Sequence, residues 1–397
     1  MVTTSLPAAA SMHNADLYHI DDLLDAEERA VRDRVRSFMD AEVLPVINGY
    51  WERAEFPFEL VPKLAQLGIC GGSIHGYDCP GLSAVATGLV SQELSRGDAS
   101  VATFFGVQSG LAMGTIHACG SEEQRQRWLP PMARMEVIGA FGLTEPNVGS
   151  DAGHPETRAT RQGDCWVLDG EKRWIGNASI ADVTIIWARD DEGHVGGFLV
   201  ERGTPGFIAT TMTGKLAQRA VWQAAVTLSN CRIPLENRLA KATTFRAASG
   251  VLMQARTGVA WGALGHAMAC YEAALAYTTR REQFGKPLAA FQLVQEKLVR
   301  MLAAVTRGQL MCLRVSQLVD AGKLSHAAAS LAKFSVARDA REVAQLARDL
   351  MGGNGILLEN HVARHLADLE AVFTYEGTDH INALVVGREI TGLNAIV

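Results

Sequence analysis

The chain has 397 residues, of which 48% are hydrophobic and 20% charged, so it is long enough for two or three globular domains. Its net charge of -6 argues against a nucleic-acid partner and against an anionic membrane surface. The seven cysteines include no C-x-x-C pair. We therefore expect neither a disulfide framework nor a zinc site, and a reducing compartment is indicated.

Residues 1–19 lack the basic start and the sustained apolar run of a signal peptide, so a disordered tail is expected there. No window reaches the length of a membrane span. The last residues carry no peroxisomal tripeptide. A cytoplasmic location is the resulting expectation.

Residues 20–136 show helical periodicity and predict an N-terminal helical domain. Val31, Val35 and Phe38 recur on one face of a segment that Glu27-Glu28 opens. Two apolar helices follow, over 84–94 and 101–117. Ser121 to Gln124 then reads as a capping-box start of another helix.

Between residues 137 and 243 the apolar runs become short and β-branched, at a spacing near ten residues with no helix between them. This pattern predicts a middle antiparallel β domain. Asp169-Gly170 lies between two apolar runs and predicts a hairpin turn.

Helical periodicity returns over 244–397. The segment 251–279 is apolar on nearly every face, and its glycines offer flat surfaces for close helix packing, so it should be a central helix. Three further segments, beginning near Phe291, Leu331 and Asn360, complete a predicted four-helix bundle. The expected fold class is α+β and mainly helical.

Several familiar kinds of site are not indicated. The chain has no G-x-G-x-x-G after a strand, no Walker loop, no H-E-x-x-H and no G-x-S-x-G. The sequence therefore lacks the motifs typical of Rossmann enzymes, NTPases, zincins and α/β-hydrolases. No histidine pair has supported metal-ligand spacing, so no metal is expected.

Glycine- and hydroxyl-rich turns remain. The loop 142–151 exposes backbone N–H groups beside two hydroxyls and could hold an anionic ligand, or it could be an ordinary turn. Trp174 could cover a flat ring, although a core tryptophan is commoner. The corner 280–287 pairs guanidinium with an aromatic ring, as a pyrophosphate and a base require, or it is a solvated helix connection.

Two more positions have alternative interpretations. Gly352-Gly353 offers close backbone approach but equally suits a helix C-cap. Arg256 lies inside the apolar central helix, where a charge requires a partner, and a structural ion pair is favoured.

Glu376 lies in a short break between two helical segments, between Tyr375 and Gly377. This environment suits a general base. The alternative is an N-cap cluster, because Thr378 and Asp379 are good caps for the next helix.

Taken in order, five motifs resemble those of the acyl-CoA dehydrogenase family over essentially the whole chain. Within the family the likeness is to the glutaryl-CoA dehydrogenase branch and the plant short-chain acyl-CoA oxidases. The motifs are L-T-E-P-x-x-G-S-D at 143–151, W-I-x-N at 174–177, R-x-x-F-G-x-P-L at 281–288, G-G-N-G at 352–355 and Y-E-G-T at 375–378.

The resemblance implies FAD and the oxidation of an acyl-CoA thioester to the 2,3-enoyl-CoA. Glu376 would remove the α-proton while the β-hydrogen leaves as hydride to flavin N5. The backbone N–H of Glu376 and a ribityl hydroxyl would polarise the thioester carbonyl.

The resemblance also assigns contacts. Those to FAD are Phe141, Leu143, Thr144, Gly149, Ser150, Trp174, Gly176, Arg281, Phe284, Gln292, Gly352, Gly353, Thr378 and His380. Those to the substrate are Ser150, Ala102, Phe105, Arg256, Tyr375 and Gly377. Arg281, Phe284 and Gln292 would reach FAD across a subunit interface, which implies a homo-oligomer and most simply a tetramer.

Two departures from the family pattern bear on function. Gly176 stands where the dehydrogenases have a threonine beside flavin N5, which should open space there, and the plant oxidases share this glycine. Ala102 stands where glutaryl-CoA dehydrogenases have an arginine for the distal carboxylate, and residues 101–105 are uncharged. With Phe104 and Phe105 beside it, this favours a short-chain or branched acyl group.

The leading hypothesis is a short-chain acyl-CoA dehydrogenase that passes electrons to an electron-transfer flavoprotein. The alternatives are an acyl-CoA oxidase that reduces O2 to peroxide, a homologue that binds acyl-CoA without oxidising it, and a flavin enzyme that acts on a substrate other than an acyl-CoA.

Overall fold

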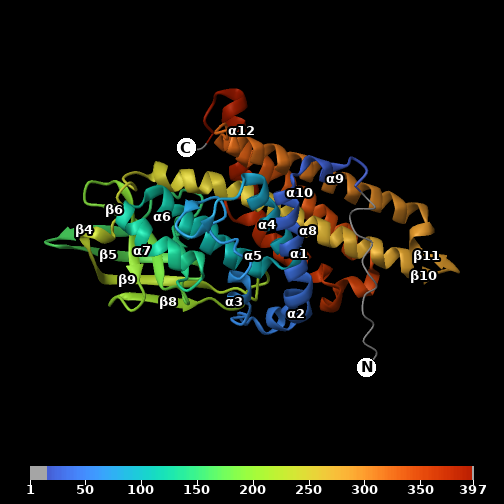
Figure 1. Cartoon of the computed structure of the whole chain (residues 1–397), viewed down its shortest axis with the longest axis horizontal. Helices are drawn as coiled ribbons and strands as arrows, with labels where there is room; N and C mark the ends of the chain where they lie inside the picture. Colours follow the sequence, from blue (N-terminus) through green and yellow to red (C-terminus); the bar gives the residue numbers. More distant parts are fainter. Residues whose placement is uncertain (1–15, 396–397) are drawn as a thin grey trace.

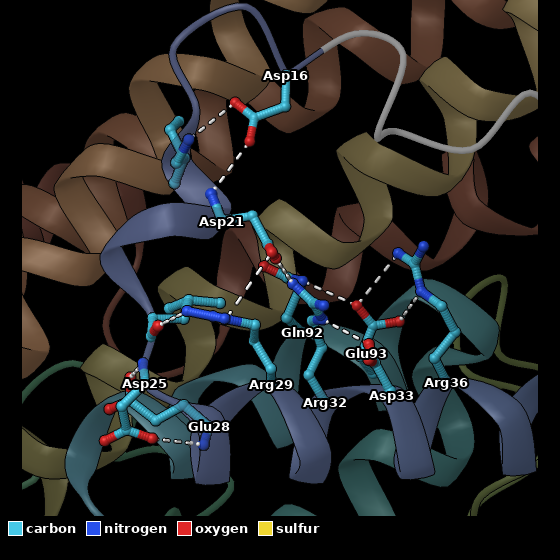
Figure 2. A network of polar contacts seen from close by, with 12 residues as sticks. Asp16, Asp21, Asp25, Glu28, Arg29, Arg32, Asp33, Arg36, Gln92 and Glu93 are labelled. Carbon is cyan, nitrogen blue, oxygen red and sulfur yellow. Dashed lines mark hydrogen bonds and ion pairs between the residues drawn. The ribbon is translucent and has the colours of Figure 1, made fainter.

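The computed structural model describes residues 16–395, so most of the expected N-terminal tail lies outside the described residues. Asp16 accepts hydrogen bonds from the backbone of Ile20 (3.0 Å) and Asp21 (3.1 Å) at the start of the 3₁₀ turn η2 (Ile20–Leu23). Figure 2 shows Asp21 directed toward Arg29 and Arg32 of the first long helix. These contacts fix the chain's entry to the N-terminal domain.

The N-terminal part is helical, as predicted. It contains α1 (Ala26–Phe38), the π-helical turn η3 (Met39–Val43), α2 (Leu44–Arg53), α3 (Leu60–Ala65), α4 (Ala84–Gly97), α5 (Ala99–Phe105), the π-helical turn η4 (Gly106–Ala112), α6 (Met113–Cys119) and α7 (Glu122–Ala133). A small ribbon, β1 (His75–Gly76) and β2 (Cys79–Pro80), lies between α3 and α4. The predicted capping box is confirmed, since Ser121 and Gln124 satisfy each other's backbone N–H groups.

The prediction that no segment is long enough to span a membrane is wrong by length and composition. The continuous helix Ala99–Cys119 has 21 residues and a mean hydropathy of 1.2. However, 61% of that window is buried inside the protein, where Phe104 and Ile116 belong to the core. Its apolar character is therefore explained by packing against neighbouring elements.

The middle part is one seven-stranded sheet with the order β3-β6-β4-β5-β9-β8, and β7 pairs with β6. Its strands are β3 (Gly139–Gly142), β4 (Arg158–Gln162), β5 (Cys165–Gly176), β6 (Val183–Asp190), β7 (Val195–Glu201), β8 (Phe207–Thr211) and β9 (Gln223–Pro234). The predicted antiparallel pairing is wrong at β6, because β3 and β4 both run parallel to it. The other strand pairs are antiparallel.

The predicted hairpin at Asp169-Gly170 is also wrong, because both residues lie inside β5. The register against β9 shifts between Leu168 and Gly170, and Gly170 has a φ of 146°. A Cβ on Gly170 would come within 2.6 Å of Thr157 Oγ1. The glycine therefore marks a β-bulge with close backbone approach, which turn statistics alone do not separate from a hairpin.

The C-terminal part is a helical bundle. Its helices are α8 (Phe245–Arg280), α9 (Gln292–Asp320), α10 (His326–Leu350), α11 (Val362–Thr374) and α12 (Asp379–Thr391), with the ribbon β10 (Glu282–Gln283) and β11 (Lys286–Pro287) between α8 and α9. Helix α12, the helical segment expected after Glu376, follows the four helices of the predicted bundle. Gly265 confirms the expected close packing, because a Cβ there would lie 2.1 Å from the Gln92 carbonyl of α4.

Figure 1 shows the sheet at one end of an elongated molecule and the β10–β11 corner at the other, with α1, α4 and α5 between them. The expected class, α+β and mainly helical, is confirmed in this three-part arrangement. The long helix α8 runs along much of the molecule, so residues near its two ends are far apart. This separation determines which predicted site residues can meet within one chain.

Candidate active site

Glu376 lies in the four-residue turn between α11 and α12, as the sequence predicts. Its φ is 53° and that of Gly377 is 83°, so two consecutive residues of the turn have a left-handed backbone conformation. Thr378 caps α12 by accepting from the Ile381 backbone N–H at 3.2 Å. The Asn382 amide donates to the Gly377 carbonyl at 2.7 Å and the Thr378 carbonyl at 3.1 Å. Residues 375–378, called the base turn below, therefore hold Glu376 and also cap helix α12.

The carboxyl group of Glu376 is poorly solvated. Its Oε2 atom is buried and has no hydrogen-bond partner among the described residues. Burial raises the pKa of Glu376 to about 7, against the opposing effect of the positive charges on Arg256 and Lys333. A carboxylate with this pKa is present near neutral pH and is a stronger base than an exposed glutamate.

The two nearby cations hold the backbone of the turn. Arg256 Nε donates to the Glu376 carbonyl at 3.3 Å, and an Arg256 terminal nitrogen donates to Ser330 Oγ at 3.2 Å. Lys333 Nζ donates to the carbonyls of Phe373 and Gly377, each at 2.9 Å. The prediction of a structural ion pair for Arg256 is therefore wrong among the described residues. Its guanidinium instead donates hydrogen bonds to a carbonyl and a hydroxyl.

Helix α5 lies between this turn and the end of β5. Thr103 lies near the Tyr375 hydroxyl and lowers its pKa, against the larger effect of burial, which raises the pKa of Tyr375 to about 12. Asn177, which follows β5, donates its amide to the Phe104 carbonyl at 3.1 Å. Phe105 is buried in the core, and Ala102 is half-buried against it. The structure therefore brings α5 beside Tyr375 through Thr103.

The expectation of open space beside Gly176 is wrong. A Cβ on Gly176 would lie only 2.9 Å from Val107 Cγ2, which is closer than real Cβ contacts occur. Val107 comes from η4, directly after α5, and occupies the position that a side chain at residue 176 would take. Steric complementarity between these two residues could not be inferred from either motif alone.

A buried ion pair supports the loop 142–151. Lys172 Nζ lies 2.7 Å from Glu145 Oε1, and neither side chain exposes more than 1% of its surface. Glu145 also accepts from the Thr157 backbone N–H at 3.0 Å and the Thr157 hydroxyl at 2.6 Å. Lys172 Nζ donates to the Leu143 carbonyl at 3.1 Å. This cluster joins the loop after β3 to the strand that carries Trp174.

Some of the residues assigned to FAD in the middle domain are exposed to solvent, and others are buried in the core. Trp174 is 55% exposed, with a φ of 65°. It is therefore not a core tryptophan, which was the commoner of the two interpretations. Gly149 and Ser150 are exposed and Thr144 is half-buried, whereas the side chains of Phe141 and Leu143 are buried in the core. The Arg173 guanidinium lies 5.7 Å from the centre of the Trp174 ring, and the rest of the indole is exposed. An exposed indole surface with exposed N–H and hydroxyl groups in the same domain fits a flat ring that carries an anionic tail.

The remaining residues assigned to FAD in the bundle lie at the opposite end. Phe284 is 93% exposed, and Arg281, Gln292, Gly352 and Gly353 are exposed as well. Asn354 donates to the Tyr277 hydroxyl at 2.8 Å, so the G-G-N-G turn lies beside the C-terminal end of α8. The N-terminal end of α8 lies near the loop 142–151, since a Cβ on Gly153 would be 3.6 Å from Phe245.

At about 1.5 Å per residue, the 36 residues of α8 separate these two groups by about 50 Å within one chain. Thr378 and His380 are elsewhere again, at the start of α12, where His380 is exposed. One chain therefore assembles the base turn, α5 and the end of β5, but does not bring the bundle corner to them.

Sequence reasoning missed a set of buried polar residues behind the base turn. Arg364 and Asp98 form a fully buried ion pair at 3.1 Å, and Asp368 accepts from Trp51 Nε1 at 3.0 Å. Arg364 and Asp368 are spaced i,i+4 in an amphipathic helix, on its buried side. The argument applied to Arg256, that a charge on an apolar face needs a partner, would have found them.

Comparisons with known proteins agree along the chain. Residues 25–136, 140–231 and 243–391 match the acyl-CoA dehydrogenase N-terminal, middle and C-terminal domains. The mitochondrial short-chain specific acyl-CoA dehydrogenase of Rattus norvegicus is 33% identical over 373 residues, which cover 92% of this chain and 90% of that protein.

Solved structures give the same answer. A crystal structure of glutaryl-CoA dehydrogenase from Mycobacterium smegmatis is 45% identical, with a TM-score of 0.94 over 96% of this chain and 99% of that one. Another from the same organism, in complex with FADH2, is 40% identical with a TM-score of 0.95 and the same coverage. Sequence, fold and the turn that carries Glu376 agree, and the chain belongs to the acyl-CoA dehydrogenase family.

Proposed function

We propose that this protein is an FAD-dependent enzyme that oxidises a short-chain or branched acyl-CoA to the 2,3-enoyl-CoA, with Glu376 as the base for the α-proton. The observation that carries the proposal is the half-buried Glu376, whose Oε2 atom is buried without a hydrogen-bond partner and whose pKa is raised to about 7. The named relatives, a short-chain dehydrogenase and an FADH2-bound glutaryl-CoA dehydrogenase, support the reaction class and the cofactor.

The chain's own residues supply the proton transfer. The α-proton of a thioester is a weak acid, so its removal needs a base of matched pKa and a polarised carbonyl. Arg256 and Lys333 bind carbonyl groups of the base turn and leave the Glu376 carboxylate unpaired and basic. The backbone N–H of Glu376 would donate to the thioester oxygen. Bound FAD would accept the β-hydrogen as hydride.

The flavin would be held by the loop 142–151 and the exposed Trp174, which the Glu145 and Lys172 pair connects. The bundle corner with Arg281 and Phe284 is about 50 Å away along α8 within one chain, so a second copy would supply those contacts. This requirement supports a homo-oligomer, for which we propose a tetramer.

The substrate proposal rests on the absence of charge along α5. Residues 99–105 carry no cation, and Ala102 offers nothing to bind a distal carboxylate such as that of glutaryl-CoA. The buried rings of Phe104 and Phe105 limit the space on this side. An uncharged short or branched acyl group is therefore favoured.

The electron acceptor is proposed to be an electron-transfer flavoprotein in the cytoplasm. Gly176 raised O2 as an alternative, but Val107 fills the space that its missing side chain leaves, and this packing favours the dehydrogenase.

Anaerobic titration with butyryl-CoA, isobutyryl-CoA and glutaryl-CoA, followed by admission of air, tests the proposal. We expect the first two to bleach the flavin absorption and glutaryl-CoA to leave it unchanged, with bleaching that persists in air. Rapid recovery in air with peroxide would support the oxidase. A protein that binds FAD and acyl-CoA but is never bleached would support the non-oxidising homologue.

A further inference from the structure

The segment 212–222, between β8 and β9, connects the middle domain to both helical parts. Arg219 donates to the backbone carbonyls of Trp51 (2.9 Å) and Glu52 (2.8 Å) in the last turn of α2. The backbone N–H of Ala220 donates to Ser100 Oγ at 3.2 Å. Residues 219 and 220 of this segment are therefore held against the N-terminal domain.

Gln218 is the residue of this segment that reaches the base turn. It is 3% exposed and has a φ of 48°, so its backbone is held in an uncommon conformation. Its side-chain amide donates to the Tyr375 hydroxyl at 3.2 Å, and its backbone N–H donates to the Asp368 carboxylate. Tyr375 and Asp368 belong to one helix and the turn that follows it.

The Tyr375 hydroxyl is thus bonded to one domain and lies near another. Gln218 contacts it from the middle domain, and Thr103 contacts it from α5 of the N-terminal domain. The Tyr375 backbone N–H is bonded to the Ala371 carbonyl at 2.9 Å. Because Tyr375 directly precedes Glu376, a constraint on its ring is a constraint on the base turn.

Asp368 supports Gln218 from behind. Its Oδ1 atom accepts from both the Gln218 backbone and Trp51 Nε1, and its side chain is fully buried. The neighbouring ion pair of Arg364 and Asp98 is buried as well. Asp368 Oδ2 has no hydrogen-bond partner among the described residues, and burial raises the pKa of Asp368 to about 7. Gln218 is held through Oδ1 and is 3% exposed, so it has little freedom to move away from Tyr375.

We propose that Gln218 is a positioning residue that connects the middle domain to Tyr375 and so fixes the turn carrying Glu376, a role that rests on the proposed function of Glu376. Without the hydrogen bond the Tyr375 ring can move, and water can approach the carboxyl group of Glu376. Two consequences follow. The base is less well aligned with the α-proton, and the pKa of Glu376 falls toward its ordinary value because its burial is reduced.

The test is a double-mutant cycle on the holoenzyme. Gln218→Met keeps the length of the side chain and removes its donor, and Tyr375→Phe removes one oxygen from the other partner. Leu216→Ala is the matched control, because Leu216 lies in the same segment and is 67% exposed. The readout is the rate of flavin reduction at saturating butyryl-CoA, measured in stopped flow from pH 5.5 to 9, together with KM.

We expect Gln218→Met to lower this rate by about three- to tenfold, the range of one net hydrogen bond, with little change in KM. The double variant should fall no further than Tyr375→Phe alone, and the acidic limb of the rate profile should move to lower pH in Gln218→Met. Leu216→Ala should match the wild type. A Gln218→Met rate equal to wild type, or effects of the two changes that multiply, would overturn the proposal.

Glu376→Gln, measured alongside, separates this inference from the proposed function. If Glu376→Gln reduces flavin as fast as the wild type, the base assignment itself is wrong. If Glu376→Gln is inactive while Gln218→Met equals the wild type, the base assignment stands and the role of Gln218 is rejected.

Discussion

The buried pair of Lys172 and Glu145 should be the main support of the loop 142–151, and the cost of removing either partner should differ. Lys172→Met leaves Glu145 with the two donors of Thr157 and the backbone N–H of Glu156. Glu145→Leu leaves Lys172 buried with only the Leu143 carbonyl as acceptor and removes the acceptor of three donors. The second change should therefore cost more.

Breaking a buried ion pair costs about 3–5 kcal/mol, and we place Lys172→Met near 3 and Glu145→Leu near 5. A cost of about 3 kcal/mol corresponds to a local opening that is about a hundredfold more frequent. Because the two residues interact directly, the double variant should cost less than the sum of the single ones.

Hydrogen exchange measured by mass spectrometry on peptides covering 143–157 and 165–176 gives this local opening directly, and flavin content gives the consequence for the site. Lys297→Met is the control, since its pair with Asp349 lies on the surface and should contribute less than about 1 kcal/mol. Unchanged exchange in both peptides for Lys172→Met, or a smaller effect for Glu145→Leu, would refute the reasoning.

Two further predictions concern single contacts. Gly176→Ala should destabilise the protein by about 1–3 kcal/mol, because the added Cβ would meet Val107. Adding Val107→Ala should restore most of the melting temperature. A Gly176→Ala variant with an unchanged melting temperature would contradict this packing. Burial raises the pKa of Glu376 from 4.5 to about 7, so the folded state binds its proton more tightly and this carboxyl destabilises the fold progressively as pH rises between those values. Glu376→Gln should therefore melt higher than wild type at pH 8 and equally at pH 4.5, and equal melting temperatures at pH 8 would refute the raised pKa.

Much of the architecture could be predicted because it depends on local patterns. Helical periodicity located the bundle, and Ser121 with Gln124 gave a helix start that the structure reproduces. The break that holds Glu376 was visible because Thr378 caps the following helix. These features need only neighbours in sequence.

The failures involve contacts between distant residues. The turn signal of Gly170 could not reveal Thr157, the neighbour that requires a glycine there. Strand β4 is not indicated by the sequence, because Arg158–Gln162 is polar at most positions, although it pairs on both sides. Likewise, Val107 beside Gly176 and Gln218 beside Tyr375 are joined by tertiary packing alone.

The central claim is that the carboxylate of Glu376 removes the α-proton. The most direct measurement is the anaerobic stopped-flow rate of flavin reduction by butyryl-CoA in the wild type and in Glu376→Gln, each loaded with FAD. A positioned general base contributes about a hundred- to ten-thousandfold, so the variant should be at least a hundredfold slower while still binding acyl-CoA. A rate within tenfold of the wild type would contradict the account.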